Sequence, residues 1–366
     1  MKQNENNLLN VSSAVREYFG LPVYHPSDPL IKDWLETNRF RSVIVFLIDA
    51  LGARLLQYHL PSDAFLRRHM KQEIPTVFPP TTAAATTSFL TGKSPAETGW
   101  LGWDQYFKEV DDEVILFYGT GIYSGREYGR TFAYDALPVE WIHEELRRSG
   151  IRAESVWPAF GSEHPSKTFD ELLENGRRIA DDPETSFIYM YWDAFDDLCH
   201  KEGPWSSSAG ESVKTMNDRL EQWRESLPKD SGVLVLADHG QTAVTPADLR
   251  ENPELLDCLA HLPTLEGRAA AMHVKPGMHS LFAERFHAAF GDSFRLLRKE
   301  EVLNSHLFGP GEPHARTAEF IGDYLAVGTG HLRLACTDKQ MLAAGDHAGL
   351  TDEERMIPNI LFEGKQ

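Results

Sequence analysis

The chain alternates between short, continuous apolar segments and amphipathic stretches. The segments Ser42–Ile48, Ser186–Trp192 and Val233–Ala237 are dominated by β-branched, aliphatic and aromatic residues and lack the alternation of a half-exposed strand. Such runs are typical of strands that are buried on both faces of a parallel sheet. Between them lie stretches such as Ser212–Leu227, whose apolar residues recur at helical spacing. The pattern predicts an α/β fold, a three-layer α/β/α sandwich around a mostly parallel central sheet.

Residues that can bind a metal ion follow each of these apolar segments. Asp49 follows the first segment, Asp196 and His200 follow the second, and Asp238 and His239 follow the third. The carboxyl ends of parallel strands share one edge of the sheet, where open α/β sheets bind their ligands. Asp and His side chains suit zinc and similar transition metals. The sequence therefore predicts a metal centre at this edge.

A further candidate ligand, His347, lies in a loop bounded by Gly345 and Gly349. With it, the set provides three ligands for each of two metal ions and leaves coordination positions for a substrate and a nucleophile. Paired metal ions clamp the attacking and leaving oxygens of an in-line displacement. The predicted ligands are Asp49, Asp196, His200, Asp238, His239 and His347.

The stretch Phe78–Gly92 predicts a helix that begins at a threonine hydroxyl. Two prolines precede Thr81 and Thr82, and Gly92 is typical of the residue just past a helix C-terminus. The N–H groups and the dipole at a helix N-terminus favour negative charge, which suits a nucleophile that attacks a phosphate. Position alone allows either threonine. We expect Thr82 to be the nucleophile, because the small side chains of Ala83–Ala85 let a phosphate approach the free N–H groups beside it.

Charge and composition exclude several classes of partner. The chain has 366 residues, 42% of them hydrophobic, and a formal net charge of -19. This charge argues against binding to nucleic-acid polymers or to anionic membranes. Segment 1–10 is polar, and the longest apolar run, Val43–Ile48, is too short to span a membrane. The three cysteines are too few and too scattered for a disulfide framework, so we expect a cytoplasmic enzyme.

Five motifs occur in order between Ile48 and Glu354. They are Ile48-Asp49; Phe78-Pro79-Pro80-Thr81-Thr82 with Thr91-Gly92 after it; Asp196 to His200 with Gly203-Pro204 after it; Asp238-His239-Gly240; and the His347 loop before an acidic helix. Together they resemble the motifs of the alkaline phosphatase superfamily, in its type I phosphodiesterase/nucleotide pyrophosphatase branch. The absence of a cysteine at the nucleophile position argues against a sulfatase.

This resemblance implies an alkaline phosphatase-like fold, two zinc sites with Mn²⁺ as the alternative metal, and a covalent phosphothreonine intermediate on Thr82. By this similarity, one ion is held by Asp196, His200 and His347, and the other by Asp49, Asp238, His239 and Thr82. The function expected is a two-metal-dependent hydrolase of phosphodiester or pyrophosphate bonds. Its partners would be small phosphorylated substrates, nucleotides included.

Two alternatives stay open at this point. A phosphomonoesterase or a phosphonate hydrolase would apply the same chemistry to another substrate. A non-catalytic binding protein could keep the fold, although the complete ligand set argues against a decayed site. The chain also departs from the family at Trp103, where phosphodiesterases often place an asparagine that binds a phosphoryl oxygen. We expect Trp103 to contact the substrate.

The segment 248–316 differs from the rest because no metal-capable residue directly follows a buried strand in it. We interpret it as an inserted α/β cap subdomain that shapes specificity without contributing to the chemistry. Residues 1–247 and 317–366 would then form the catalytic core. A strand-like pattern returns at 320–326.

Overall fold

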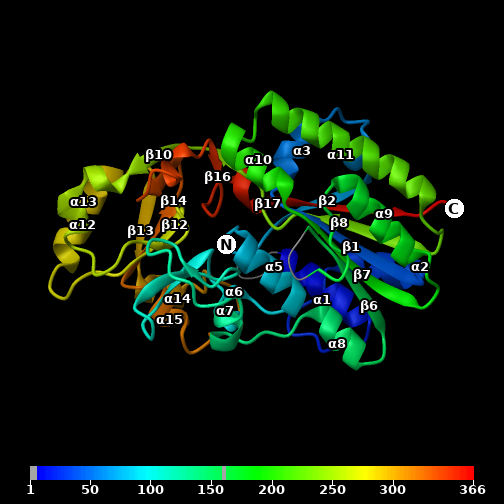
Figure 1. Cartoon of the computed structure of the whole chain (residues 1–366), viewed down its shortest axis with the longest axis horizontal. Coiled ribbons are helices and arrows are strands. Elements are labelled where there is room, and N and C mark those ends of the chain that lie inside the picture. The colour runs from blue at the N-terminus through cyan, green and yellow to red at the C-terminus, as the bar shows by residue number, and fades with distance from the viewer. Residues whose placement is uncertain (1–5, 159–161) are drawn as a thin grey trace.

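The protein is described here by a computed structural model that covers residues 6–158 and 162–366. Residues 1–5 of the polar N-terminal segment lie outside the described chain. Figure 1 shows two parts side by side, one built on a six-stranded sheet and the other on a seven-stranded sheet. We call the six-stranded sheet with the helices packed on it the large lobe. The seven-stranded sheet and its helices form the small lobe.

The sheet of the large lobe confirms the predicted fold class. Its strand order is β2-β17-β8-β1-β7-β6, in which β8, β1, β7 and β6 are parallel and β17 is antiparallel to both neighbours. The strands are β1 (Ser42–Ile48), β2 (Met70–Pro75), β6 (Arg152–Val156), β7 (Thr185–Trp192), β8 (Ser231–Leu236) and β17 (Met356–Glu363). Every residue of β1 is buried, as its continuous apolar pattern predicts.

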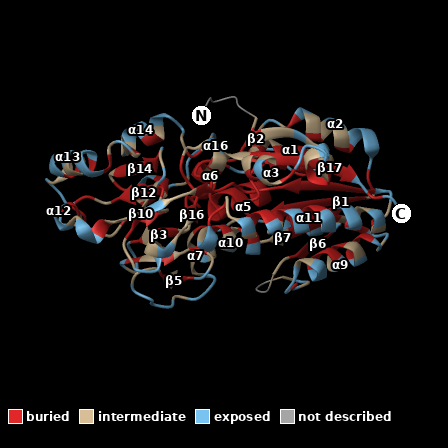
Figure 2. Cartoon of the chain, turned by 90° about the horizontal axis from the view of Figure 1, so that it is seen from above, coloured by how far each residue is buried: buried red, intermediate tan, exposed pale blue. Residues whose placement is uncertain are grey.

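Helices cover both faces of this sheet. Figure 1 shows α1, α5 and α8 on one side and α3, α9 and α11 on the other. Figure 2 shows exposed outward faces on α9 and α11 and buried strands, whereas every residue of α5 is buried. The bounds are α1 (Leu8–Tyr18), α2 (Pro29–Asn38), α3 (Ala53–His59), α4 (Phe65–His69), α5 (Thr82–Thr91), α8 (Ile142–Arg148), α9 (Phe169–Ala180), α10 (Ala194–Glu202) and α11 (Ser207–Ser226). Among the described helices, none combines the length and apolar character needed to cross a membrane.

The small lobe is built on an antiparallel sheet with the order β13-β14-β12-β11-β3-β4-β5. Alternate side chains of its strands enter two separate cores: Leu325 and Val327 pack in the cluster around Trp100, whereas Ala326 packs with Phe282. The strands are β3 (Asp104–Phe107), β4 (Asp112–Ile115), β5 (Thr120–Gly121), β11 (Thr264–Leu265), β12 (Ala269–Met272), β13 (Phe294–Arg298) and β14 (Tyr324–Gly328).

Shorter elements complete the fold. The helices are α6 (Pro95–Thr98), α7 (Phe132–Ala136), α12 (Pro253–Leu256), α13 (His279–Phe290), α14 (Lys299–Asn304), α15 (Thr317–Phe320) and α16 (Asp352–Arg355), with 3₁₀ turns at Leu249–Glu251 and Gln340–Leu342. Two small strand pairs join β10 (Thr245–Asp248) to β15 (Leu332–Ala335) and β9 (Thr242–Ala243) to β16 (Gly345–Asp346).

The segment 248–316 supplies β11, β12 and β13 of the small-lobe sheet. The remaining strands come from outside that segment, since β3, β4 and β5 precede it and β14 follows it. The strand predicted over 320–326 is wrong at its start. Residues Thr317–Phe320 form α15, and Gly322, with a φ of 69°, turns the chain before β14 begins at Tyr324.

A buried ion pair connects the two lobes. Arg268 precedes β12 in the small lobe, and its Nε and Nη2 donate to the two carboxylate oxygens of Glu354 at 2.6 and 2.8 Å. Both side chains are fully buried. Glu354 lies in α16, just before β17 of the large lobe, and also accepts from the N–H of Gly349 at 2.7 Å. The pair therefore fixes the loop that carries His347.

Replacing Arg268 should destabilise the protein strongly. Arg268→Met leaves the buried Glu354 carboxylate unpaired, which should lower the free energy of unfolding in urea by about 3–5 kcal/mol. Arg68→Ala is the control, because it breaks a pair with Glu221 whose two side chains are both about half exposed, and it should cost less than about 1 kcal/mol. Equal losses in the two variants would contradict the role given to Arg268.

Candidate active site

The loops after β1, β7 and β8 meet at one edge of the large-lobe sheet, next to the N-terminus of α5. Hydrogen bonds from main-chain N–H groups fix their relative positions. The N–H of Asp49 donates to the carbonyl of Trp192 at 2.9 Å, and the N–H of Ala50 donates to Asp238 Oδ1 at 3.2 Å. The parallel register of the strands thus brings the predicted ligands together, as the sequence predicts.

Asp49, Asp238 and His239 form the first group of candidate metal ligands. His239 Nε2 lies 3.3 Å from Asp49 Oδ1 and 3.6 Å from Asp238 Oδ2. Both of these carboxylate oxygens are buried and lack a hydrogen-bond partner among the described residues. His239 Nδ1 lies 3.0 Å from the carbonyl oxygen of Gly240, to which it can donate. That bond leaves the lone pair of Nε2 directed at the carboxylates, as in a metal site.

Asp196, His200 and His347 form the second group. The first two face each other one turn apart on α10, with His200 Nε2 at 3.3 Å from Asp196 Oδ2. His347 arrives from the loop after β16, and its Nε2 lies 4.0 Å from Asp196 Oδ1. Nδ1 of His200 lies 2.8 Å from the carbonyl of Gly345, and Nδ1 of His347 lies 3.0 Å from that of Pro80. In His200, His239 and His347 alike, Nδ1 lies against a main-chain carbonyl and Nε2 is directed toward the carboxylates of the site.

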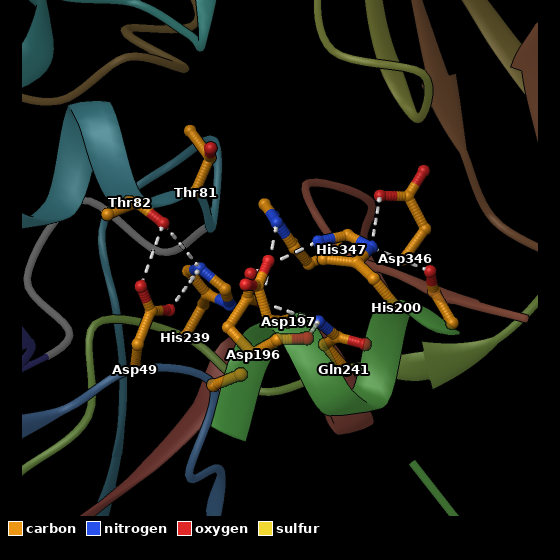
Figure 3. Close-up of polar contacts among 12 residues, drawn as sticks. Asp49, Thr81, Thr82, Asp196, Asp197, His200, His239, Gln241, Asp346 and His347 are labelled. Carbon is orange, nitrogen blue, oxygen red and sulfur yellow. Dashed lines mark hydrogen bonds and ion pairs between the residues drawn. The ribbon is translucent and has the colours of Figure 1, made fainter. Parts of the chain in front are cut away.

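The two groups adjoin, as Figure 3 shows. The rings of His239 and His347 stack with their centres 3.8 Å apart. Within each group the potential ligand atoms lie within 4.8 Å of one another. The structure therefore brings all six residues named from the sequence into one site.

Burial and mutual repulsion set the charges at this site. Burial raises the pKa of Asp49 well above its usual value, and the carboxylates of Asp238 and Asp196 raise it further. Burial lowers the pKa of His347 to about 3. Burial opposes charge on His200 as well, but Asp196 outweighs it and raises the pKa of His200 to about 10. Divalent cations would compensate the clustered carboxylates, so the residues fit the metal that the sequence predicts.

The two candidate nucleophiles have different surroundings. Thr82 Oγ1 lies 3.2 Å from His239 Nε2 and 3.4 Å from Asp49 Oδ2, beside the first group (Figure 3). Thr81 instead donates its hydroxyl hydrogen to Glu266 Oε1. Both sit at the start of α5, which Gly92 ends in a left-handed conformation, as predicted. The first turn of a helix leaves N–H groups without partners in the helix, and here those groups lie next to Thr82.

Three residues that sequence reasoning missed support the ligands. Tyr191 donates its hydroxyl hydrogen to Asp49 Oδ2, and Gln241 Nε2 donates to Asp196 Oδ1. Asp346 Oδ1 lies 3.9 Å from Nδ1 of the ligand His200, and its Oδ2 accepts from Arg333 Nε at 2.6 Å. Gln241 directly follows the Asp238-His239-Gly240 motif and Asp346 lies within the His347 loop, and these positions are a signal that could have found them. Tyr191 offers no such signal, because an aromatic residue in an apolar strand is normally core.

Trp103 reaches the nucleophile stretch through its main chain. Its N–H donates to Glu266 Oε1 at 2.9 Å, the same oxygen that accepts from Thr81. Its indole ring is half-buried and packs edge-on against Phe117 and Tyr118. Substrate contact by Trp103 stays a prediction.

Comparison with known families gives a match over residues 43–329, to the family described as type I phosphodiesterase/nucleotide pyrophosphatase. The matched region contains both threonines and every candidate ligand except His347. A comparison with curated proteins gives no match.

Solved structures with the same fold come from animals and bacteria. Murine ectonucleotide pyrophosphatase/phosphodiesterase 5, as an inactive threonine-to-alanine variant in complex with AMP, has a TM-score of 0.63 and 18% identity, over 88% of each chain. The human protein of the same name has a TM-score of 0.64 and 16% identity, over 88% of this chain and 89% of that one. Phosphonoacetate hydrolase from Sinorhizobium meliloti 1021, in complex with phosphonoacetate, has a TM-score of 0.65 and 16% identity, over 88% and 90%.

The geometry predicts a metal content that single substitutions should change. Purified protein supplemented with zinc should contain about two equivalents per chain by elemental analysis. His347→Ala removes a ligand from the second group and should lower the content to about one equivalent. Asp197→Ala is the control, because Asp197 is exposed and neighbours a ligand without belonging to either group. A folded wild-type protein with a content near zero would contradict the assignment.

Proposed function

Because the chain belongs to the type I phosphodiesterase/nucleotide pyrophosphatase family, a family of phosphoester hydrolases, we propose that it is a two-metal-dependent phosphohydrolase that acts through Thr82. Its substrates are small phosphorylated molecules with phosphodiester or pyrophosphate bonds. The observation that carries the proposal is the position of the Thr82 hydroxyl. It lies at a helix N-terminus, within 3.4 Å of two members of one candidate metal group, with the other group adjoining.

Each residue has a role in this mechanism. Asp49 and His239 orient the Thr82 hydroxyl, and the N–H groups of the first turn of α5 face the phosphate oxygens. Divalent ions bound by the two groups would lower the pKa of the hydroxyl and neutralise the charge of the phosphate. Thr82 loses its hydroxyl proton to solvent and its Oγ1 attacks phosphorus in line. The bond to the leaving oxygen breaks, that oxygen takes up a proton from solvent, and a phosphothreonine forms. Water hydrolyses this ester and restores the threonine.

The comparisons support a small phosphorylated substrate. The murine structure holds AMP in a variant made inactive by replacing a threonine with alanine, and the bacterial structure holds phosphonoacetate. Three aspartates and three histidines favour Zn²⁺, with Mn²⁺ as the alternative. We also propose that the small lobe, including 248–316, sets substrate preference, since the candidate ligands lie outside that segment.

A second candidate function is hydrolysis of phosphonates or phosphomonoesters. The fold shared with phosphonoacetate hydrolase favours it, because the same core can hold a ligand with a carbon–phosphorus bond. Bis-p-nitrophenyl phosphate and p-nitrophenyl phosphate distinguish the two candidates when they are assayed with added zinc or manganese. The proposal expects the diester to be cleaved with the higher kcat/KM. A clear preference for the monoester would favour the second candidate.

Substitution of the two threonines tests the nucleophile. Thr82→Ala removes the attacking oxygen and should lower kcat on the best ester by at least about 10³-fold, while metal content stays near two equivalents. Thr81→Ala should cost less than about tenfold, because its hydroxyl donates to Glu266 and not to the metal groups. Normal turnover in Thr82→Ala together with a large loss in Thr81→Ala would move the assignment to Thr81.

A further inference from the structure

A cavity of about 70 Å³ lies in the small lobe, and two of its lining residues hydrogen-bond to neighbours of the candidate active-site residues. Glu266, in its wall, accepts the hydroxyl hydrogen of Thr81, the residue before the proposed nucleophile. Arg333, also in the wall, donates to Asp346, the residue before His347. The lining residues used below are Trp103, Asp104, Tyr123, Glu266, Arg333 and Gln340.

The carboxyl groups of Asp104 and Glu266 line the cavity with the guanidinium of Arg333, and one carboxyl oxygen of Asp104 lacks a partner. Asp104 is only 5% exposed, and its Oδ1 has no hydrogen-bond partner among the described residues. Burial raises the pKa of Asp104 well above its usual value, and the nearby carboxyl of Glu266 raises it further. Burial likewise raises the pKa of Glu266 to about 8. A buried oxygen without a partner is costly, so a donor that enters this cavity would be stabilised.

The guanidinium group of Arg333 in the cavity wall already donates to other acceptors. Arg333 donates through Nε to Asp346 and through Nη1 to the carbonyl oxygen of Gln340. The hydroxyl of Tyr123 donates to the carbonyl of Pro263 at 2.8 Å. These groups therefore leave the carboxyl of Asp104 free to accept from a ligand.

We propose that this cavity is a subsite for a small ammonium group carried by the substrate, an inference that rests on the proposed function. An ammonium group provides hydrogen-bond donors for the carboxyl groups of Asp104 and Glu266. It also carries a positive charge, which favours the ionised form of these carboxyl groups. The aromatic residues Trp103 and Tyr123, which are among those that line the cavity, also suit a cation. Size points to a short aminoalkyl chain, because an engineered cavity of about 150 Å³ is filled by benzene, and this cavity is smaller than that.

The test compares two esters that differ in charge and little in shape. One is p-nitrophenyl aminoethyl phosphate and the other is p-nitrophenyl propyl phosphate, and each releases p-nitrophenol when water replaces it on phosphorus. For the wild-type protein with zinc, kcat/KM should be at least about tenfold higher for the aminoethyl ester. Equal values would overturn the inference and leave the proposed function intact.

Substitutions assign the preference to the cavity. Asp104→Asn keeps the shape but cannot ionise beside a bound ammonium group, so the ratio of the two kcat/KM values should fall toward one. Asp112→Asn is the matched control, because Asp112 is also buried in this sheet, on β4, but is bonded to Ser124 and Tyr128 outside the cavity. The control should keep the wild-type ratio. An unchanged ratio in Asp104→Asn would overturn the assignment.

A binding measurement keeps the inference testable if neither ester is hydrolysed, a result that would count against the proposed function. Titration calorimetry of the zinc-loaded protein with aminoethyl phosphate and propyl phosphate needs no turnover. The inference expects tighter binding of aminoethyl phosphate by at least about tenfold. Equal affinities would overturn it.

Discussion

The constraint on which the rest of this structure depends is the burial of acidic side chains at one edge of a parallel sheet. Asp49, Asp196 and Asp238 lie together there, and oxygens of Asp49 and Asp238 have no hydrogen-bond partner among the described residues. Such oxygens are costly to bury unless positive charge neutralises them. The nearby histidines direct Nε2 at the carboxylates because main-chain carbonyls lie against Nδ1. Divalent cations would neutralise these clustered carboxylates, and a threonine hydroxyl lies beside them.

The small lobe takes part in this site through the loop that carries His347. Arg333 holds Asp346 on one side of this histidine, and Arg268 holds Glu354 beyond its other side. Glu266 of the same lobe accepts from Thr81, the residue before Thr82. The small lobe, which we propose sets substrate preference, is therefore hydrogen-bonded to residues next to the proposed catalytic ones. This arrangement explains how a segment without ligands can lie so close to the chemistry.

The sequence indicated the parallel strands of the large lobe because their signals are local, but it did not indicate the antiparallel β2 and β17. A continuous apolar strand such as Ser42–Ile48 is followed directly by its functional residue, and Gly92 ends the nucleophile helix within the same stretch. The small-lobe sheet was harder to foresee because its strands are short and pair across long separations, as Leu265 does with Asp104. Glu266 and Asp104 follow no motif, so only the fold shows that they share a cavity. Tyr191 looked like a core residue because it is an aromatic residue in an apolar strand.

The most direct test of this account is the location of bound metal. Crystals grown with zinc can be measured on both sides of the zinc absorption edge, and the anomalous difference map then locates each ion. The account predicts two peaks, one among Asp49, Asp238 and His239 beside Thr82 Oγ1, and one among Asp196, His200 and His347. Peaks elsewhere, with both groups empty in a well-ordered site, would contradict it.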